Sequence, residues 1–182
     1  KAQMPHWHVE PVAQMPELTT LVIKRDLQEL LQPALCKVVE RDVLPAYLAN
    51  RRWFSQDSTQ ASEPSLLYCL PFGEADTQQV LCEVQVQGAD GLDSYQLPLG
   101  YVDERGTGSH TPQQLALSRL RRGRQVGLMT DAFSLPSFSQ AVLTHLRDQT
   151  VLQGQGHEVQ FLGSEQLLSL EPRSDDEVRL LF

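Results

Sequence analysis

The chain has few of the residues that build cross-linked or metal-bound scaffolds. Its 182 residues include three cysteines, Cys36, Cys69 and Cys82, and no two of them form a CxxC pair. This odd number and wide spacing argue against a disulfide framework and against a structural zinc site. We expect each thiol to be a small buried group rather than a reactive one.

Long apolar runs and positive net charge are also missing. No stretch approaches the roughly 20 apolar residues that a membrane-spanning helix needs, and no charged-then-apolar signal segment opens the chain. We therefore expect a cytoplasmic protein without a membrane partner. The net charge of −8 disfavours binding to nucleic acid, because such binding needs a basic surface that neutralises phosphates.

The sequence motifs that bind nucleotides are missing as well. There is no GxxxxGK[ST] loop and no GxGxxG segment, and lysine occurs only as Lys1, Lys24 and Lys37. The Gly-rich loop, HRD and DFG motifs of protein kinases and the GxSxG elbow of hydrolases are not found. From its residues alone the chain is predicted to hold no catalytic residue, no cofactor-binding residue and no metal ligand.

Two hypotheses of catalysis stay open, one based on carboxylates and one on histidines. Acidic residues are numerous, so a hydrolase that uses scattered carboxylates is one alternative. His110 and His157 lie in Gly-rich segments and are able in principle to move protons, although exposed loop histidines usually do not. A panel of glycoside substrates distinguishes this hypothesis from a chain without catalysis.

The N-terminal third changes from an extended to a helical pattern. Residues 1–22 contain three prolines and little apolar periodicity, which is typical of a linker or extended arm, although the run Leu18–Ile23 has the composition of a short strand. Asp26 is placed to cap a helix, with Glu29 as its capping-box partner. Apolar residues then recur at helical spacing up to Leu48, and we expect Pro45 to open a new turn rather than continue one helix.

The middle of the chain alternates with a period of two. Residues 66–72, 79–87 and 94–101 each have the pattern of a strand, and short turns connect them, which favours an antiparallel meander. A hairpin around Gly123 and a helix capped by Asp131 follow. The segment 159–162 resembles a strand, and 165–170 a short strand or a connector.

These patterns together predict an α+β fold. A helix packs on a curved antiparallel sheet, and a smaller α+β subdomain follows. The expected division of the chain is an arm over residues 1–22, a first unit over 23–102 and a second unit over 112–182.

Two surface segments are candidate interaction sites. Arg52, Trp53 and Phe54 end the predicted helix where a polar loop is usual, and we interpret them as an anchor that locks the helix end onto the sheet. Stacking of Trp53 on a sugar ring is the alternative. Arg121 and Arg122 belong to a cluster near Gly123 whose guanidinium groups are suited to bind phosphate or a carboxylate-rich partner; a turn that merely exposes its charges is the simpler explanation.

The first of these segments carries a resemblance. The run Leu44–Leu48, followed after three residues by Arg52-Trp53-Phe54, resembles the entry motif of the maltokinase N-terminal cap. That motif usually continues with two small residues and a lysine, and Ser55-Gln56-Asp57 stands there instead. Further similarities follow in the order of the family: Pro16-Glu17-Leu18 leading to Leu30-Leu31, then Tyr95–Leu99, Arg122-Gly123, Gly127-Leu128 and Asp131-Ala132.

The resemblance implies a place in trehalose metabolism. It implies that residues 23–102 are a cystatin-like cap and that 112–182 begin the intermediate subdomain of a maltokinase, ending before its ATP-binding loop. Such an enzyme phosphorylates maltose to maltose 1-phosphate with ATP and Mg²⁺, which supplies α-glucan (glycogen) synthesis. The implied partners are the kinase lobes of the same polypeptide, a fused trehalose synthase domain, which is an isomerase, and maltose. The chain alone is then expected to be inactive. The alternative from a different class is a free-standing interaction module of similar helix-on-sheet shape.

Overall fold

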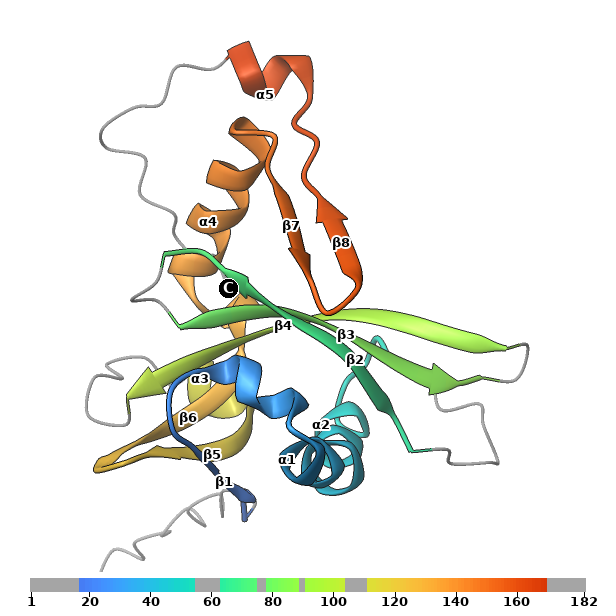
Figure 1. Cartoon of the computed structure of the whole chain (residues 1–182), viewed down its shortest axis with the longest axis vertical. Coiled ribbons are helices and arrows are strands. Elements are labelled where there is room, and N and C mark those ends of the chain that lie inside the picture. The colour runs from blue at the N-terminus through green and yellow to red at the C-terminus, as the bar shows by residue number, and fades with distance from the viewer. Residues whose placement is uncertain (1–16, 55–62, 75–77, 89–90, 104–110, 170–182) are drawn as a thin grey trace, which may run out of the picture.

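The computed structural model describes residues 17–54, 63–74, 78–88, 91–103 and 111–169 (Figure 1). Ser55-Gln56-Asp57, His110, most of the proposed arm and the end of the chain lie outside these described residues. No helix in the described ranges combines the length and apolar character needed to cross a bilayer.

Six strands form one curled sheet in the order β1-β5-β6-β4-β3-β2. The strands are β1 (Thr20–Ile23), β2 (Ser65–Phe72), β3 (Gln79–Gln87), β4 (Leu92–Asp103), β5 (Ala116–Arg122) and β6 (Gln125–Asp131). Every neighbouring pair is antiparallel except β1 and β5. The sheet curls around a helical segment, as Figure 1 shows. The predicted α+β class, with helix on curved sheet and an antiparallel meander, is confirmed.

The short strand β1 joins the sheet far from its neighbours in sequence. It pairs in parallel with β5, from Thr20 opposite Arg119 to Ile23 opposite Arg122. Strand β4 pairs on its other side with β6. The sheet therefore contains strands from both sides of the proposed division between residues 102 and 112.

The helical segment begins with a cap that Asp26 and Glu29 share. The Asp26 carboxylate accepts the Gln28 N–H at 3.0 Å at the start of η1 (Leu27–Leu31). The Glu29 carboxylate turns back, as expected of a capping box, but its bonds come from the N–H groups of Lys24 at 3.1 Å and Arg25 at 2.6 Å. These backbone donors, the Lys24 N–H above all, lower the pKa of Glu29.

After an extended residue at Gln32, the segment restarts and continues through Pro45 without a further break. It runs through α1 (Pro33–Val38), the π-helical turn η2 (Val39–Val43) and α2 (Leu44–Leu48). The Leu44 N–H binds the Val39 carbonyl, five residues back. Proline lacks an N–H and its ring collides with the carbonyl four residues earlier in an α-helix, and a wider turn before it relieves this crowding. The predicted restart at Pro45 is therefore a change of winding within one helical segment.

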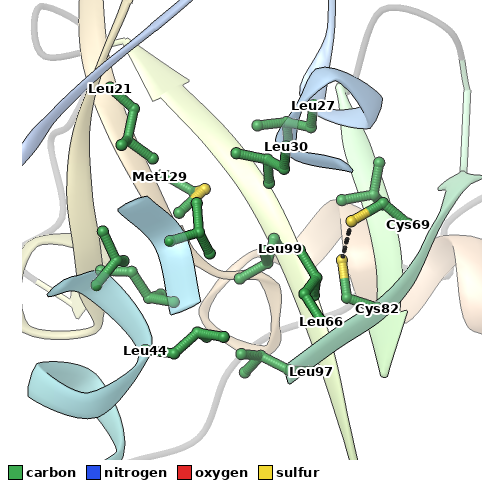
Figure 2. Close-up of a cluster of buried hydrophobic side chains, with 14 of the residues drawn as sticks. Leu21, Leu27, Leu30, Leu44, Leu66, Cys69, Cys82, Leu97, Leu99 and Met129 are labelled. Atoms are coloured by element: carbon green, nitrogen blue, oxygen red, sulfur yellow. Dashed lines mark hydrogen bonds between the residues drawn. The ribbon is translucent and has the colours of Figure 1, made fainter. Parts of the chain in front are cut away.

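The main core lies between this segment and the inner, concave face of the sheet (Figure 2). Leu30, Val39 and Leu44 from the helices and Leu97 and Leu99 from β4 are at most 1 % exposed. Its other buried members are Leu21, Ile23, Leu27, Val43, Tyr47, Leu48, Leu66, Cys69, Val80, Cys82, Val84, Leu117, Leu120 and Met129.

Two of the cysteines form a cross-strand pair in this core. Cys69 of β2 lies opposite Cys82 of β3, and the Cys82 thiol donates to the Cys69 sulfur at 3.1 Å. Both are buried free thiols, and Cys36 is half-buried. The expectation that they are small buried groups is confirmed for Cys69 and Cys82.

A second, smaller layer covers part of the outer face. It contains η3 (Ala132–Ser134), α4 (Pro136–Arg147) and a hairpin of β7 (Val151–Gly154) and β8 (His157–Gln160). Phe72 and Leu81 of the sheet pack there against Phe138. The remaining helices are α3 (Thr111–Gln114) and α5 (Glu165–Ser169).

Two local predictions about this layer are wrong. Asp131 caps η3, not α4, because its carboxylate accepts the Phe133 N–H at 2.9 Å. Residues 165–169 form α5 rather than a strand or connector. The Ser164 hydroxyl caps the start of this helix, because it accepts the Leu167 N–H at 3.3 Å.

One side chain clamps the hairpin to the edge of the sheet. The Gln155 amide donates to the Cys69 carbonyl at 3.2 Å and accepts the Cys69 N–H at 3.1 Å, as a neighbouring strand would do. Gln155 and Gly156 both have positive φ, 51° and 78°, which a two-residue turn of type I′ requires. The turn thus aims the amide at β2.

We predict that Gln155→Asn destabilises the chain. The shorter amide cannot make both bonds to Cys69, while asparagine still accepts the positive φ. We expect the free energy of unfolding to fall by about 1–2 kcal/mol, measured by urea denaturation, with faster hydrogen exchange of the Cys69 amide. Gln160→Asn, at an exposed position of the same hairpin, is the matched control. Equal stability of both variants contradicts the clamp.

We predict that the native thiols react slowly. Burial, reinforced by Glu40, raises the pKa of Cys36 to about 11, and burial raises that of Cys82 well above its ordinary value. Because thiolate is the reactive species, iodoacetamide at pH 8 should label native Cys36 on the order of a hundredfold more slowly than the urea-unfolded chain and should leave Cys69 and Cys82 unlabelled. Folding raises the pKa of Cys36, so the folded chain holds the thiol proton more tightly than the unfolded chain does. The contribution of Cys36 to stability is therefore complete below its unfolded pKa of 9.0 and is lost as the pH rises towards 11. Rapid native labelling would contradict this assignment.

Candidate interaction surfaces

Trp53 and Phe54 follow the end of α2 on a tight turn. The Phe54 N–H donates to the Arg51 carbonyl at 3.2 Å. The ring of Tyr95 on β4 lies 5.5 Å from that of Trp53 and 5.6 Å from that of Phe54. Phe54 is half-buried against the core, whereas Trp53 keeps 48 % of its surface exposed. Three rings thus join the helix end to the sheet.

The arginines of this turn lie differently. Arg52 is exposed. Arg51 places its guanidinium 4.4 Å above the ring of Tyr47, one helical turn earlier. This contact is not among the predictions from the sequence, although a spacing of four residues on a helix is a signal for it.

Tyr47 also makes a buried contact with the far end of the sheet. Its hydroxyl donates to Asp131 at 2.6 Å, across 84 residues of sequence. Burial, followed by the Asp131 carboxylate, raises the pKa of Tyr47 far above its ordinary value. No sequence pattern joins the two residues, because the contact exists only once α2 lies across the end of β6.

The arginine hairpin is split between the two faces of the sheet. Arg122 lies on the inner face, 5.8 Å from the Tyr101 ring, and donates to Gln125 at 2.6 Å. Arg121 lies on the outer face and is exposed. Successive residues of a strand point to opposite faces, so adjacent arginines in the sequence do not form one site.

The described residues offer little for acid–base or metal chemistry. They contain no group of three or more His, Cys, Asp or Glu placed to hold a metal ion. His157 is half-buried with its ring 5.0 Å from that of Tyr68. His145, stacked 4.8 Å from Phe72, has a pKa lowered by burial.

We predict that Tyr47→Phe destabilises the chain by about 1–3 kcal/mol, because it leaves a buried oxygen of Asp131 without its donor. Tyr95→Phe is the control, since Tyr95 contacts its neighbours through its ring; its effect should stay within about 0.5 kcal/mol. Urea denaturation of both variants measures the difference. Equal free energies of unfolding would mean that the Tyr47–Asp131 bond contributes nothing.

Comparison with known proteins gives a match to a family model. No curated protein sequence matches the chain. One family model does match: residues 47–133, slightly less than half of the chain, match the maltokinase N-terminal cap domain. The match begins at Tyr47 and includes the Trp53–Phe54 turn, strands β2 to β6 and Asp131, the partner of Tyr47. Residues 47–133 are therefore similar to a maltokinase N-terminal cap.

Proposed function

We propose that the chain is the non-catalytic N-terminal cap region of a maltokinase. The observation that carries the proposal is the match of residues 47–133 to the cap family. The fold supports it, because the match falls on the curled sheet and the helix end that packs on it. Nucleotide-binding motifs are missing from the sequence, which is consistent with a region that supports an enzyme without reacting itself.

In this proposal the chemistry belongs to kinase lobes of the same polypeptide. Those lobes bind ATP, Mg²⁺ and maltose and form maltose 1-phosphate, and no residue of this chain is assigned to any of them. Fusion to a trehalose synthase domain and a cytoplasmic location complete the proposal. The support for the fusion is the similarity of Pro16-Glu17-Leu18 and Leu30-Leu31 to the segment that joins the two enzymes.

We assign different tasks to the two aromatic residues of the turn. Phe54 is the anchor, because it packs against the core and Tyr95. Trp53 is the contact with the kinase lobes, because half of a large apolar side chain stays exposed beside that anchor. Tyr95 supports Trp53 from the sheet, so its ring stays fixed.

A free-standing interaction module is the second candidate. The side chains of Val22, Arg121 and Val126, near the opposite edge of the sheet, favour it because all three are exposed. The two candidates differ in one respect: only the first requires kinase lobes in the same coding sequence.

The proposal predicts the activity of the polypeptide from its complete coding sequence. With ATP and Mg²⁺ it should convert maltose to maltose 1-phosphate, detected by ³¹P NMR, while the 182-residue chain alone should give none. A coding sequence without kinase lobes, or maltokinase activity of the isolated chain, would contradict the proposal.

The role of Trp53 has a separate test. Trp53→Ala should lower the melting temperature of the complete polypeptide by several degrees more than it lowers that of the isolated chain. This difference corresponds to the loss of about 1 kcal/mol of contact between Trp53 and the kinase lobes. Leu92→Ala is the control, since Leu92 is apolar and 65 % exposed on β4. An equal shift in chain and polypeptide would mean that Trp53 contacts nothing outside this region.

A further inference from the structure

A row of exposed side chains crosses three strands on the outer face of the sheet. Val22 of β1 lies opposite Arg121 of β5, which lies opposite Val126 of β6, so the three side chains share a face. Val22 is 63 % exposed, Val126 40 % exposed and Arg121 exposed. Thr20 and Arg119 form the adjacent exposed row. We call these five residues the arginine–valine face.

The described elements that cover the rest of the sheet lie away from this face. The inner side of the same strands buries Leu21, Ile23 and Leu120 against the helical segment. The layer on the outer side packs instead on Phe72 of β2 and Leu81 of β3, at the other end of the sheet. Within the described residues nothing comparable packs on Val22 and Val126.

The charges of Arg121 and Arg124 have no ion-pair partner among the described residues. Arg121 donates to the Gly123 carbonyl at 3.2 Å, Arg124 is exposed at the turn, and neither forms an ion pair within the described parts of the chain. The Glu29 carboxylate is held by the N–H groups of Lys24 and Arg25. An excess of cationic groups therefore gathers here, in a chain whose net charge is −8.

Asp103, the carboxylate at the end of β4, lies on the other side of the sheet. It pairs with Gly127, which pairs with Leu120, and the Leu120 side chain points into the core. Partners in register share a face, so Asp103 belongs to the inner face and Arg121 to the outer face.

The edge of β1 offers hydrogen-bonding groups beside this charge. The Thr19 carbonyl accepts the Arg119 N–H at 2.9 Å, so Thr19 faces β5. Backbone groups alternate along a strand, and those of Thr20 and Val22 therefore point away from β5 to the edge of the sheet. Among the described residues no strand pairs with that edge. The strand itself, TLVI, carries neither charge nor proline, the usual protections of an edge.

We propose that the arginine–valine face is a docking surface for an acidic, extended segment of a partner polypeptide, which adds to β1 as a further strand. The backbone of the segment would bond to Thr20 and Val22. An outward glutamate or aspartate side chain would face Arg121 two strands away, a separation of about 10 Å that the two extended side chains together span. The inference is independent of the proposed role as a maltokinase cap.

Charge complementarity selects this occupant over the alternatives. A second copy of the chain, edge to edge, would bring one Arg121 towards the other and would be repelled. A nucleic acid would meet a small cationic face on a molecule whose net charge is −8. An acidic strand would pair with the backbone groups of Thr20 and Val22 and with the Arg121 guanidinium.

The first test uses charge. A fluorescein-labelled peptide of alternating threonine and glutamate is titrated with the full chain, and anisotropy is measured at about 50 mM salt, where exposed charges are weakly screened. Arg121→Glu with Arg124→Glu should weaken binding about tenfold or more. The matched control, Lys37→Glu with Arg41→Glu on the helical segment, changes the net charge equally and should leave binding within about twofold. Equal loss in both double variants would overturn the proposal, since it would show a response to net charge alone.

The second test uses the backbone. Val22→Pro removes an N–H that points to the edge of the sheet and leaves the β5 hydrogen bonds in place, so the variant should fold but bind the peptide at least about fivefold more weakly. Val22→Thr keeps the N–H and the branched shape, and should bind like the native chain. If Val22→Pro binds as tightly as Val22→Thr, strand addition is wrong.

Two further probes distinguish the other occupants. A peptide of alternating threonine and lysine should not bind, and an oligodeoxythymidine of the same length should bind more weakly than the acidic peptide. Tighter binding of the oligonucleotide, or a dimer in sedimentation that Val22→Pro abolishes, would overturn the assignment to an acidic polypeptide. The charge variants keep the proposal falsifiable even if Val22→Pro fails to fold.

Discussion

The fold depends on burying one helical segment in the hollow of one curled sheet. The segment from Leu27 to Leu48 has apolar residues on the side that faces the sheet, and the inner face of each strand supplies their partners. A fully buried leucine or valine stabilises such a core by roughly 1.5–3 kcal/mol, so this contact outweighs any single polar bond in the chain. It also sets the curvature, because a flat sheet would leave strands β1 and β2 at the two edges out of reach of one helical segment.

Polar side chains then fix how the other elements lie on this core. Tyr47 joins α2 to the end of β6 through Asp131, and Gln155 joins the hairpin to β2 through the backbone of Cys69. The Glu40 carboxylate of the helical segment accepts the N–H of Leu66, on the same edge strand β2, at 2.8 Å. Each bond satisfies a group that burial would otherwise leave unpaired, and each makes a contact specific rather than merely apolar. Such an arrangement suits the proposed cap, which would hold its shape while the proposed kinase lobes perform the chemistry.

The two faces of the sheet leave two different surfaces for partners. The end of the helical segment presents a half-exposed tryptophan supported by Phe54 and Tyr95. The far edge presents Arg121 between two exposed valines, beside β1, whose outer edge pairs with no strand among the described residues. An apolar ring fits a contact that stays closed, whereas exposed charge favours rapid and salt-sensitive encounter. The two proposed contacts therefore use different surfaces of one domain.

The sequence by itself determined the period of each segment, and with it the elements. Alternation placed β3 at residues 79–87, where the structure has it, and the glycine at 123 placed the hairpin of β5 and β6, because strand period and turn geometry are local properties. The aromatic turn at Trp53 was also predictable from the local sequence, because a large aromatic residue just after a helix end is unusual. Tertiary structure alone decided which distant groups meet: the parallel pairing of β1 with β5, the bond from Tyr47 to Asp131 and the clamp of Gln155 on Cys69. Tertiary structure also separated Arg121 from Arg122, because neighbouring residues of a paired strand lie on opposite faces of the sheet. The curl of the sheet around its helical segment decides which of these faces is buried and which is exposed.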